Sequence, residues 1–211
     1  DKIVTISKFA QKEIIDVHHV PECKVEFAYN GIKNTFYEPV NDSIEKETKR
    51  KISAIGKYLL YYGGYRKNKN VGELLDAFEK TEGYSLILTG SSSEITNLLN
   101  ESGVQDDRII NWGYASDDEI KCLLDNCISF VTPTTYEGFG LPVAEALSRG
   151  ARVICNNIEV LREVGGEDAH YFNNTLELSN LINSIESFPK PNRRIYSYKE
   201  AVKLYTRIYN E

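Results

Sequence analysis

The chain has 211 residues, of which 41% are hydrophobic, and its formal net charge is −6 at pH 7. This length allows one substantial core, alone or with a small appendage, and the negative charge argues against a nucleic-acid-binding surface. No apolar run approaches the roughly 18 residues that a membrane-spanning helix needs, and no signal peptide is visible. The four cysteines lack metal or redox spacing and are typical of reduced thiols in a cytoplasmic protein.

The first forty residues predict a small strand–helix–strand unit. We expect strands over residues 2–6 and 24–29, and between them a helix that Ser7 caps and that runs to about His18. Asn30-Gly31 then marks a turn. Residues 41–52 are polar and highly charged without strong periodicity, which favours a linker or an exposed loop.

From residue 58 onward, predicted strands and helices alternate. Strands are expected over residues 58–62, 84–89, 108–111, 128–132, 151–155 and 170–172. Helices are expected over residues 71–80, 94–101, 117–125, 143–149, 160–164, 176–185 and 196–209. This alternation is typical of an α/β domain with a Rossmann-like, doubly wound parallel sheet.

The most informative segment is Glu137-Gly138-Phe139-Gly140-Leu141-Pro142-Val143-Ala144-Glu145, in which two carboxylates lie eight positions apart. It stands between an apolar strand and a short helix, so its glycines are expected at the carboxyl end of a strand, where open α/β sheets bind ligands. The two glycines suit a backbone with unusual angles that approaches a ligand closely. Pro142 suits the first helical position, and we place Glu145 in the first helical turn.

These two carboxylates indicate a ligand that carries hydroxyl groups beside phosphate. Amide groups at a helix N-terminus attract anions, whereas a carboxylate beside a phosphate is repelled. Glu137 and Glu145 are therefore expected to accept hydrogen bonds from sugar hydroxyls. A nucleotide-sugar, which has phosphates between two polyols, fits this pattern better than a glycine-rich turn with two solvated glutamates.

A second cluster, Gly63-Gly64-Tyr65-Arg66-Lys67-Asn68-Lys69, combines a glycine pair at a strand end with three cations and a helix start. Such a loop suits a diphosphate, and a solvated basic turn is the alternative, stronger for Lys67 than for Lys69. The turn at residues 90–93 also follows a strand, where Ser93 either borders the nucleotide or simply caps a helix.

Together these segments resemble the retaining GT-B glycosyltransferases of family 4, often called group 1. Residues 136–147 are similar to the E-x7-E signature of that family, and residues 61–71 to its opening strand and diphosphate loop. Residues 108–114 resemble its base-binding strand end. Further similarity covers residues 157–164 and 168–172, after the signature, and residues 4–10 and 29–32, which resemble the stretch that joins the two domains of the family.

The resemblance implies transfer of a sugar from a nucleotide-sugar donor to a glycan, lipid or other acceptor, with retention of anomeric configuration and without a metal or other cofactor. The implied catalytic residues are Glu137, which would hold the donor sugar, and Lys69 and Arg66, which would stabilise the diphosphate leaving group. The implied donor-binding residues are Gly63, Gly64, Gly113, Tyr114, Gly138, Phe139, Gly140, Leu141 and Glu145, of which the last would hold the ribose. Many family members have arginine at the position of Gly64, so whether Arg66 replaces it stays open.

The resemblance also predicts that this chain is the C-terminal, donor-binding half of a GT-B fold. Residues 1–23 would end the N-terminal domain, residues 24–195 would bind the donor, and residues 196–211 would form a helix that crosses back. The expected partners are a nucleoside-diphosphate sugar, a glycan or lipid-linked acceptor and the missing N-terminal domain, which is compatible with a peripheral position at the inner membrane face. The isolated chain should be inactive, with apolar surface exposed in its terminal segments.

Several alternatives stay open. The chain begins with Asp1 and contains no Met, so it is expected to be either a fragment or a module that works with a separate N-terminal polypeptide. A non-enzymatic α/β regulatory domain is the third possibility. Trp112 has core packing as its default role, beside base contacts from Gly113 and Tyr114. The sequence names neither the sugar, the base, the acceptor nor the oligomeric state.

Overall fold

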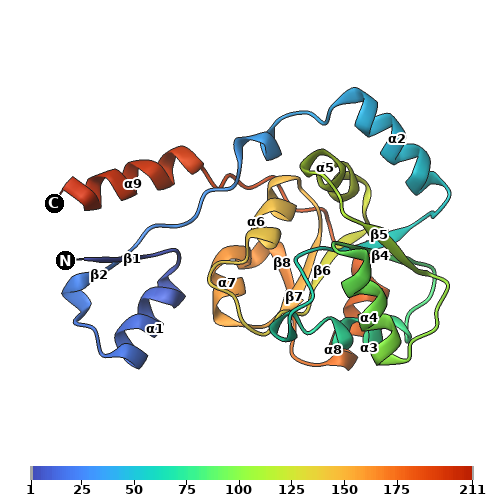
Figure 1. The fold of residues 1–211 in the computed structure, drawn as a ribbon, viewed down its shortest axis with the longest axis horizontal. Coiled ribbons are helices and arrows are strands. Elements are labelled where there is room, and N and C mark those ends of the chain that lie inside the picture. Colours follow the sequence, from blue (N-terminus) through green and yellow to red (C-terminus); the bar gives the residue numbers. More distant parts are fainter. Residues whose placement is uncertain (1, 211) are drawn as a thin grey trace.

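A computed structural model of the protein describes residues 2–210 and shows two lobes of unequal size (Figure 1). The larger lobe contains the main sheet with helices on both of its faces. The smaller lobe contains the first residues of the chain and the last helix, and both termini lie at its far end in Figure 1. None of the described helices is long and apolar enough to cross a membrane.

Six parallel strands form the sheet of the larger lobe. They are β3 (Tyr58–Tyr61), β4 (Ser85–Thr89), β5 (Ile109–Gly113), β6 (Ser129–Thr132), β7 (Val153–Asn156) and β8 (Ala169–Phe172). Their order is β5-β4-β3-β6-β7-β8, and each neighbouring pair is parallel. The order reverses where β3 meets β6, with Leu59 opposite Ser129. Open α/β sheets bind ligands at such a reversal.

Helices cover both faces of this sheet and confirm the predicted doubly wound fold. One face carries α3 (Val71–Phe78), α4 (Ser92–Ser102) and α8 (Thr175–Ser184), and the other carries α5 (Asp117–Asn126), α6 (Leu141–Ser148) and α7 (Glu159–Gly165). Successive strand residues point to opposite faces, so Leu59 packs in one core and Leu60 in the other. Because both faces are buried, the strands read as continuous apolar runs.

The predicted loop or linker over residues 41–52 is wrong, because Asp42–Ser53 forms helix α2. The Asn41 side chain caps this helix, and two ion pairs four residues apart support its exposed side. Only Thr48 and Ile52 are buried. The inward-facing side chains Ile44, Thr48 and Ile52 recur every fourth residue, but they are few among charged neighbours and give only a weak helical signal.

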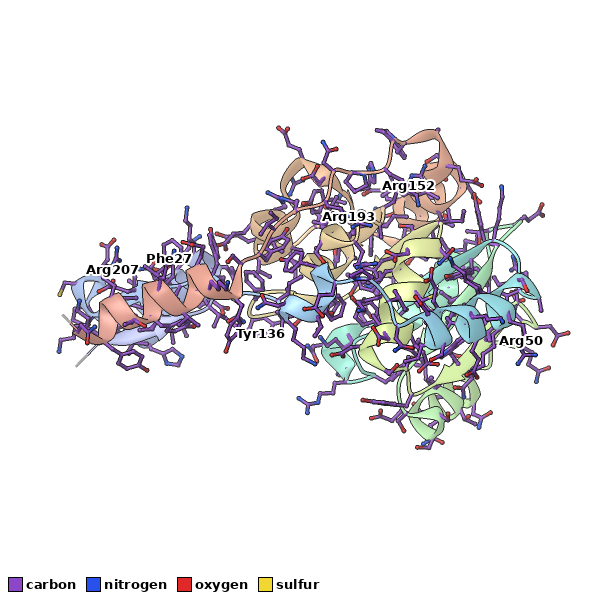
Figure 2. All side chains as sticks on the ribbon, turned by 90° about the horizontal axis from the view of Figure 1, so that it is seen from above. Phe27, Arg50, Tyr136, Arg152, Arg193 and Arg207 are labelled. Carbon is purple, nitrogen blue, oxygen red and sulfur yellow. The ribbon has the colours of Figure 1, made fainter. Side chains whose placement is uncertain are left out.

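The smaller lobe contains β1 (Ile3–Thr5), α1 (Lys8–His18), β2 (Val25–Phe27) and α9 (Tyr198–Asn210). β1 and β2 pair with each other in a separate parallel sheet. The predicted boundary at residue 24 therefore lies too early in the chain, because β2 belongs with β1 and not with the six-stranded sheet. Figure 2 shows α9 alongside these strands, where Arg207 lies 3.7 Å from the Glu26 carboxylate.

Two adjacent stretches of chain join the lobes. The Ile32 amide donates to the Tyr196 carbonyl at 3.0 Å, and Ile32 forms a parallel bridge with Ser197. Gly31 lies so close to Tyr198 that an added Cβ would overlap the Tyr198 backbone. The lobes are thus connected through a backbone crossing that tolerates only glycine at position 31.

The terminal segments expose apolar side chains, as predicted within the described residues. Those exposed on or beside the smaller lobe are Ile3, Val17, Ile195, Tyr198, Val202 and Tyr209. A groove of about 580 Å³ runs between α9 and the connection at Tyr29 and Asn30. Residues 1 and 211, which the predicted terminal segments include, lie outside the described part.

Candidate functional site

The loops that follow β3 and β6 are tied together by Asn68. Its side-chain amide donates to the Tyr136 carbonyl at 3.0 Å, and its own carbonyl accepts from the Thr135 amide at 2.8 Å and the Thr134 hydroxyl at 3.0 Å. The predicted diphosphate loop and the glutamate–glycine loop are therefore neighbours at the reversal of the sheet. This is the position that the sequence predicts for a ligand site.

Two of the predicted site residues meet here. The Lys69 ammonium forms an ion pair with the Glu137 carboxylate, and each side chain is 17% exposed. Both groups are largely withdrawn from water, where an unpaired charge is costly, and the ion pair compensates both charges.

The backbone of the glutamate–glycine loop is shaped by two glycines for different reasons. Gly140 has φ = +89° and is the N-cap of α6, and a Cβ there would press on Leu161. The φ angle of Gly138 is not positive, so the expected unusual backbone angles occur at Gly140 and not at Gly138. At Gly138 the constraint is space, since a Cβ would lie 3.1 Å from the Ile6 side chain.

The two apolar residues of this loop have different surroundings. Phe139 is 3% exposed and packs against Tyr29 and Tyr196, so its ring belongs to the core and only its backbone is free to meet a ligand. Leu141 is 40% exposed and is the first residue of α6. Pro142 is thus the second helical residue, one place later than the sequence predicts.

Glu145 lies in the second turn of α6, which corrects its expected place in the first turn. Its Oε2 accepts a hydrogen bond from the Tyr62 hydroxyl at 3.1 Å. Burial raises the pKa of the Glu145 carboxyl to about 7, although the bond from Tyr62 acts to lower it. Glu137 contacts Lys69 and Glu145 contacts Tyr62, so both carboxylates meet residues of the segment that follows β3.

The remaining diphosphate-loop residues have the geometry of an open, cationic turn. Gly63 and Gly64 have φ of +136° and +85° and are exposed, and the Tyr61 hydroxyl donates to the Gly64 carbonyl. Arg66 is exposed and forms no ion pair among residues 2–210. Its role at a diphosphate stays a prediction.

At the end of β5, the backbone of Gly113 is already occupied. Its amide donates to the Asn111 side chain at 3.1 Å, and its carbonyl accepts from the Gly90 amide at 2.9 Å. Tyr114 is 86% exposed. Trp112 is half-buried against the core with the Lys51 ammonium 5.6 Å from its ring centroid, which supports its structural role.

Helix α4 is capped by Ser91 and not by Ser93, since the Ser91 hydroxyl accepts from the Glu94 amide.

Among the histidines, His170 stacks on Phe188 with ring centroids 4.2 Å apart, and burial lowers its pKa. No cluster of three or more side chains suited to hold a metal ion occurs within the described residues. The expectation of a cofactor-free reaction stays a prediction.

Sequence reasoning missed three contacts at this site. Tyr62 reaches Glu145, the Ser7 hydroxyl donates to the Gly138 carbonyl at 2.7 Å, and the Glu163 carboxylate accepts from the amides that begin α1. Ser7 had a visible signal as a helix cap. For Tyr62, the only sequence feature that pointed to the site was its place directly before the glycine pair. Nothing in the sequence pointed to the contacts of Glu163, because its partners lie more than 150 residues away.

Comparison with known proteins agrees with this geometry. The family model described as "Glycosyl transferases group 1" matches residues 43–202. O-antigen chain mannosyltransferase B of Escherichia coli is 32% identical over 180 residues, which cover 78% of this chain and 45% of that protein. O-antigen chain mannosyltransferase RfbU of Salmonella typhimurium is 26% identical over 202 residues, covering 93% of this chain and 54% of that protein.

Solved structures share the fold. A glycosyltransferase from Rickettsia africae superposes with a TM-score of 0.84 at 16% identity, over all of this chain and 63% of its own. Anabaena HepE, in complex with UDP-glucose, gives a TM-score of 0.82 at 16% identity, over all of this chain and 64% of its own.

The chain thus spans about half the length of the curated relatives it matches. Its family is nevertheless clear, because the family model covers most of the chain and includes the ion-paired loops and the helix that carries Glu145. The chain belongs to the glycosyl transferases group 1 family.

Proposed function

We propose that this chain is the C-terminal, donor-binding half of a retaining, metal-independent glycosyltransferase. The observation that carries the proposal is the Lys69–Glu137 ion pair at the reversal of the sheet, beside the N-terminus of α6. A cation, a helix N-terminus and a carboxylate side by side match the diphosphate and the sugar of one nucleotide-sugar.

Each residue has a distinct task in this proposal. Lys69 and Arg66 hold the diphosphate and stabilise the charge that develops on it as the glycosidic bond breaks. Glu137, with the backbone amides of Gly138 to Leu141, holds the donor sugar. Glu145 holds the ribose hydroxyls. The departing phosphate accepts the proton of the acceptor hydroxyl, so this half of the enzyme needs no protein base.

The other half of the enzyme would lie against the smaller lobe. The curated relatives are about twice as long as this chain, and the smaller lobe exposes Ile3, Val17, Val202 and Tyr209. In this proposal these side chains form part of one apolar interaction site. The proposed N-terminal domain covers this surface and supplies the acceptor site, so the isolated chain binds the donor without transferring the sugar.

The names of the relatives suggest which donor to test first. The E. coli and Salmonella relatives are named mannosyltransferases, and a Xanthomonas relative, 28% identical over 112 residues, is named GDP-mannose:cellobiosyl-diphosphopolyprenol alpha-mannosyltransferase. GDP-mannose is therefore the first candidate. UDP-glucose, present in the HepE complex, is the second.

Thermal unfolding of the purified chain with GDP-mannose, UDP-glucose, GDP and UDP tests the proposal. A ligand at about 100 times its Kd stabilises the native state by about 2.7 kcal/mol and raises Tm by several degrees. We expect such a shift with one nucleotide and its sugar derivative, and its loss in Lys69→Ala but not in Lys67→Ala. No shift with any of the four would contradict the donor site. Robust sugar transfer by the isolated chain would contradict its assignment as half an enzyme.

A further inference from the structure

Tyr62 connects the end of β3 to the second turn of α6. Its ring packs on Phe130, with centroids 4.9 Å apart, and its hydroxyl lies 3.1 Å from Glu145 Oε2 and 3.1 Å from the Pro142 carbonyl. The residue stands directly before the Gly63-Gly64 pair. Its backbone is therefore fixed by β3, which ends at the preceding residue, and its ring is fixed by Phe130 in the core.

The hydroxyl of Tyr62 has one proton and two acceptors within reach. An ionised carboxylate is a stronger acceptor than a carbonyl, so the proton goes to Glu145 when Glu145 is charged. Burial raises the pKa of Tyr62 well above its ordinary value. The hydroxyl therefore remains a donor throughout the pH range in which Glu145 titrates.

Two other charged groups act on the pKa of Glu145 in opposite directions. Asp117, at the start of α5, raises the pKa of the Glu145 carboxyl and Lys33 lowers it. These two groups form an ion pair with each other at 2.7 Å. Against the burial that drives the pKa up to about 7, Tyr62 is thus the principal group that favours the charged form.

We propose that Tyr62 is a positioning residue of the donor site, which holds the Glu145 carboxylate in one orientation and keeps it ionised for the ribose of the nucleotide. The inference rests on the proposed function, in which Glu145 meets the ribose. An ionised carboxylate accepts hydrogen bonds from both hydroxyls of a diol, whereas a protonated one has lost part of its acceptor capacity. Nucleotide affinity therefore rises as Glu145 loses its proton.

A titration of the ligand-free protein tests the first part. The carboxyl carbon of Glu145, observed by NMR with labelled glutamate and assigned with Glu145→Gln, should titrate near pH 7 in the unmodified chain and at higher pH in Tyr62→Phe. The control is Tyr58→Phe, in β3, the strand directly before Tyr62. It removes a buried hydroxyl that donates to the Leu123 carbonyl and does not contact Glu145. Equal midpoints in all three proteins would overturn the inference.

Binding of GDP and UDP between pH 5.5 and 8.5, measured by calorimetry, tests the second part. Affinity of the unmodified chain should rise through pH 7. Tyr62→Phe should bind roughly threefold or more weakly at pH 7 and recover towards pH 8.5, because one pKa unit corresponds to a tenfold change in the ionised fraction below the midpoint. Tyr58→Phe should follow the unmodified profile.

The possible failures are distinct. A loss in Tyr62→Phe that is equal at every pH means that Tyr62 acts only as a packing residue, and this outcome overturns the inference while the donor site stands. Failure of the unmodified chain to bind either nucleotide overturns the proposed function and, with it, the role of Tyr62 at a ribose site.

Discussion

Lys69 and Glu137 are 68 residues apart in the chain, yet they form a partly buried ion pair. They meet because β3 and β6, which precede their loops, are neighbours in the sheet although two strands separate them in sequence. The pair keeps both charges compensated before a ligand arrives. A nucleotide-sugar would replace each partner with a better one, giving diphosphate oxygens to the ammonium and sugar hydroxyls to the carboxylate.

The ion pair makes the two single variants unequal in their effects. Lys69→Ala should weaken binding of a nucleoside diphosphate by roughly 1.5–3 kcal/mol, because a charge-assisted contact is lost, and should leave nucleoside binding nearly unchanged. Glu137→Ala removes the competitor for the ammonium, so diphosphate affinity should stay the same or increase, while affinity for the whole nucleotide-sugar falls. Calorimetry with the three ligands distinguishes these effects.

Lys67→Ala is the matched control for both variants, since Lys67 is exposed in the same loop. It should change binding by less than about 0.5 kcal/mol. Equal losses for all three ligands in Lys69→Ala and Glu137→Ala, with the fold intact by circular dichroism, would refute the separate roles.

The larger lobe was predictable because its signals are local. Runs such as Leu59-Leu60 and Phe130-Val131 are buried on both faces, and the sequence shows them as continuous apolar runs. The positions of the glycine loops and of Lys69 could be predicted because these residues come directly after predicted strands. These features need only a few neighbouring residues to be recognised.

The contacts that were missed depend on the order of strands and on surfaces between lobes. Tyr62 meets Glu145 only because β3 lies beside β6, and Ser7 meets Gly138 only because the smaller lobe docks on the loop. The helix over residues 42–53 was missed for another reason, since its burial is limited to two side chains. Local pattern has no information on the two long-range contacts, and it signals this helix only weakly.

The charged form of Glu145 should lower the stability of the folded chain while it supports nucleotide binding. Burial raises its pKa from 4.5 to about 7 in the folded chain, so the native state binds more protons than the unfolded state between these values. This contribution is fully present below about pH 4.5 and is lost as the pH rises through 7. Glu145→Gln should therefore increase stability at pH 8 by roughly 1–3 kcal/mol and weaken nucleotide binding. Urea unfolding of both proteins at pH 5 and pH 8 measures the difference; a gain of equal size at both pH values would contradict the linkage.

Gly31 should tolerate no side chain at the crossing between the lobes. A Cβ there overlaps the Tyr198 backbone, which has little freedom to move, so Gly31→Ala should destabilise the chain by roughly 1–3 kcal/mol. Gly72→Ala is the contrasting variant, because Gly72 lies in α3 with nothing within 4 Å of an added Cβ. It should be neutral or stabilising by up to about 1 kcal/mol. Urea unfolding tests both, and a Gly31→Ala variant as stable as Gly72→Ala would show that the crossing opens easily.

Glu163 should act as the anchor of the smaller lobe on the larger one. Its carboxylate accepts from the Lys8 amide at 2.7 Å and the Phe9 amide at 3.0 Å. These amides form the N-terminus of α1, where the helix dipole favours negative charge and where the first turn has no acidic residue of its own. Glu163→Ala should cost roughly 0.5–2 kcal/mol, as loss of a helix cap does, and should speed hydrogen exchange of these two amides. Glu159→Ala is the control: it lies in the same helix, α7, and its pair with Lys12, at 3.5 Å between two largely exposed side chains, contributes little. Exchange measured by NMR should therefore change at the start of α1 only in Glu163→Ala. Equal protection in both variants would mean that Ser7 alone holds α1 in place.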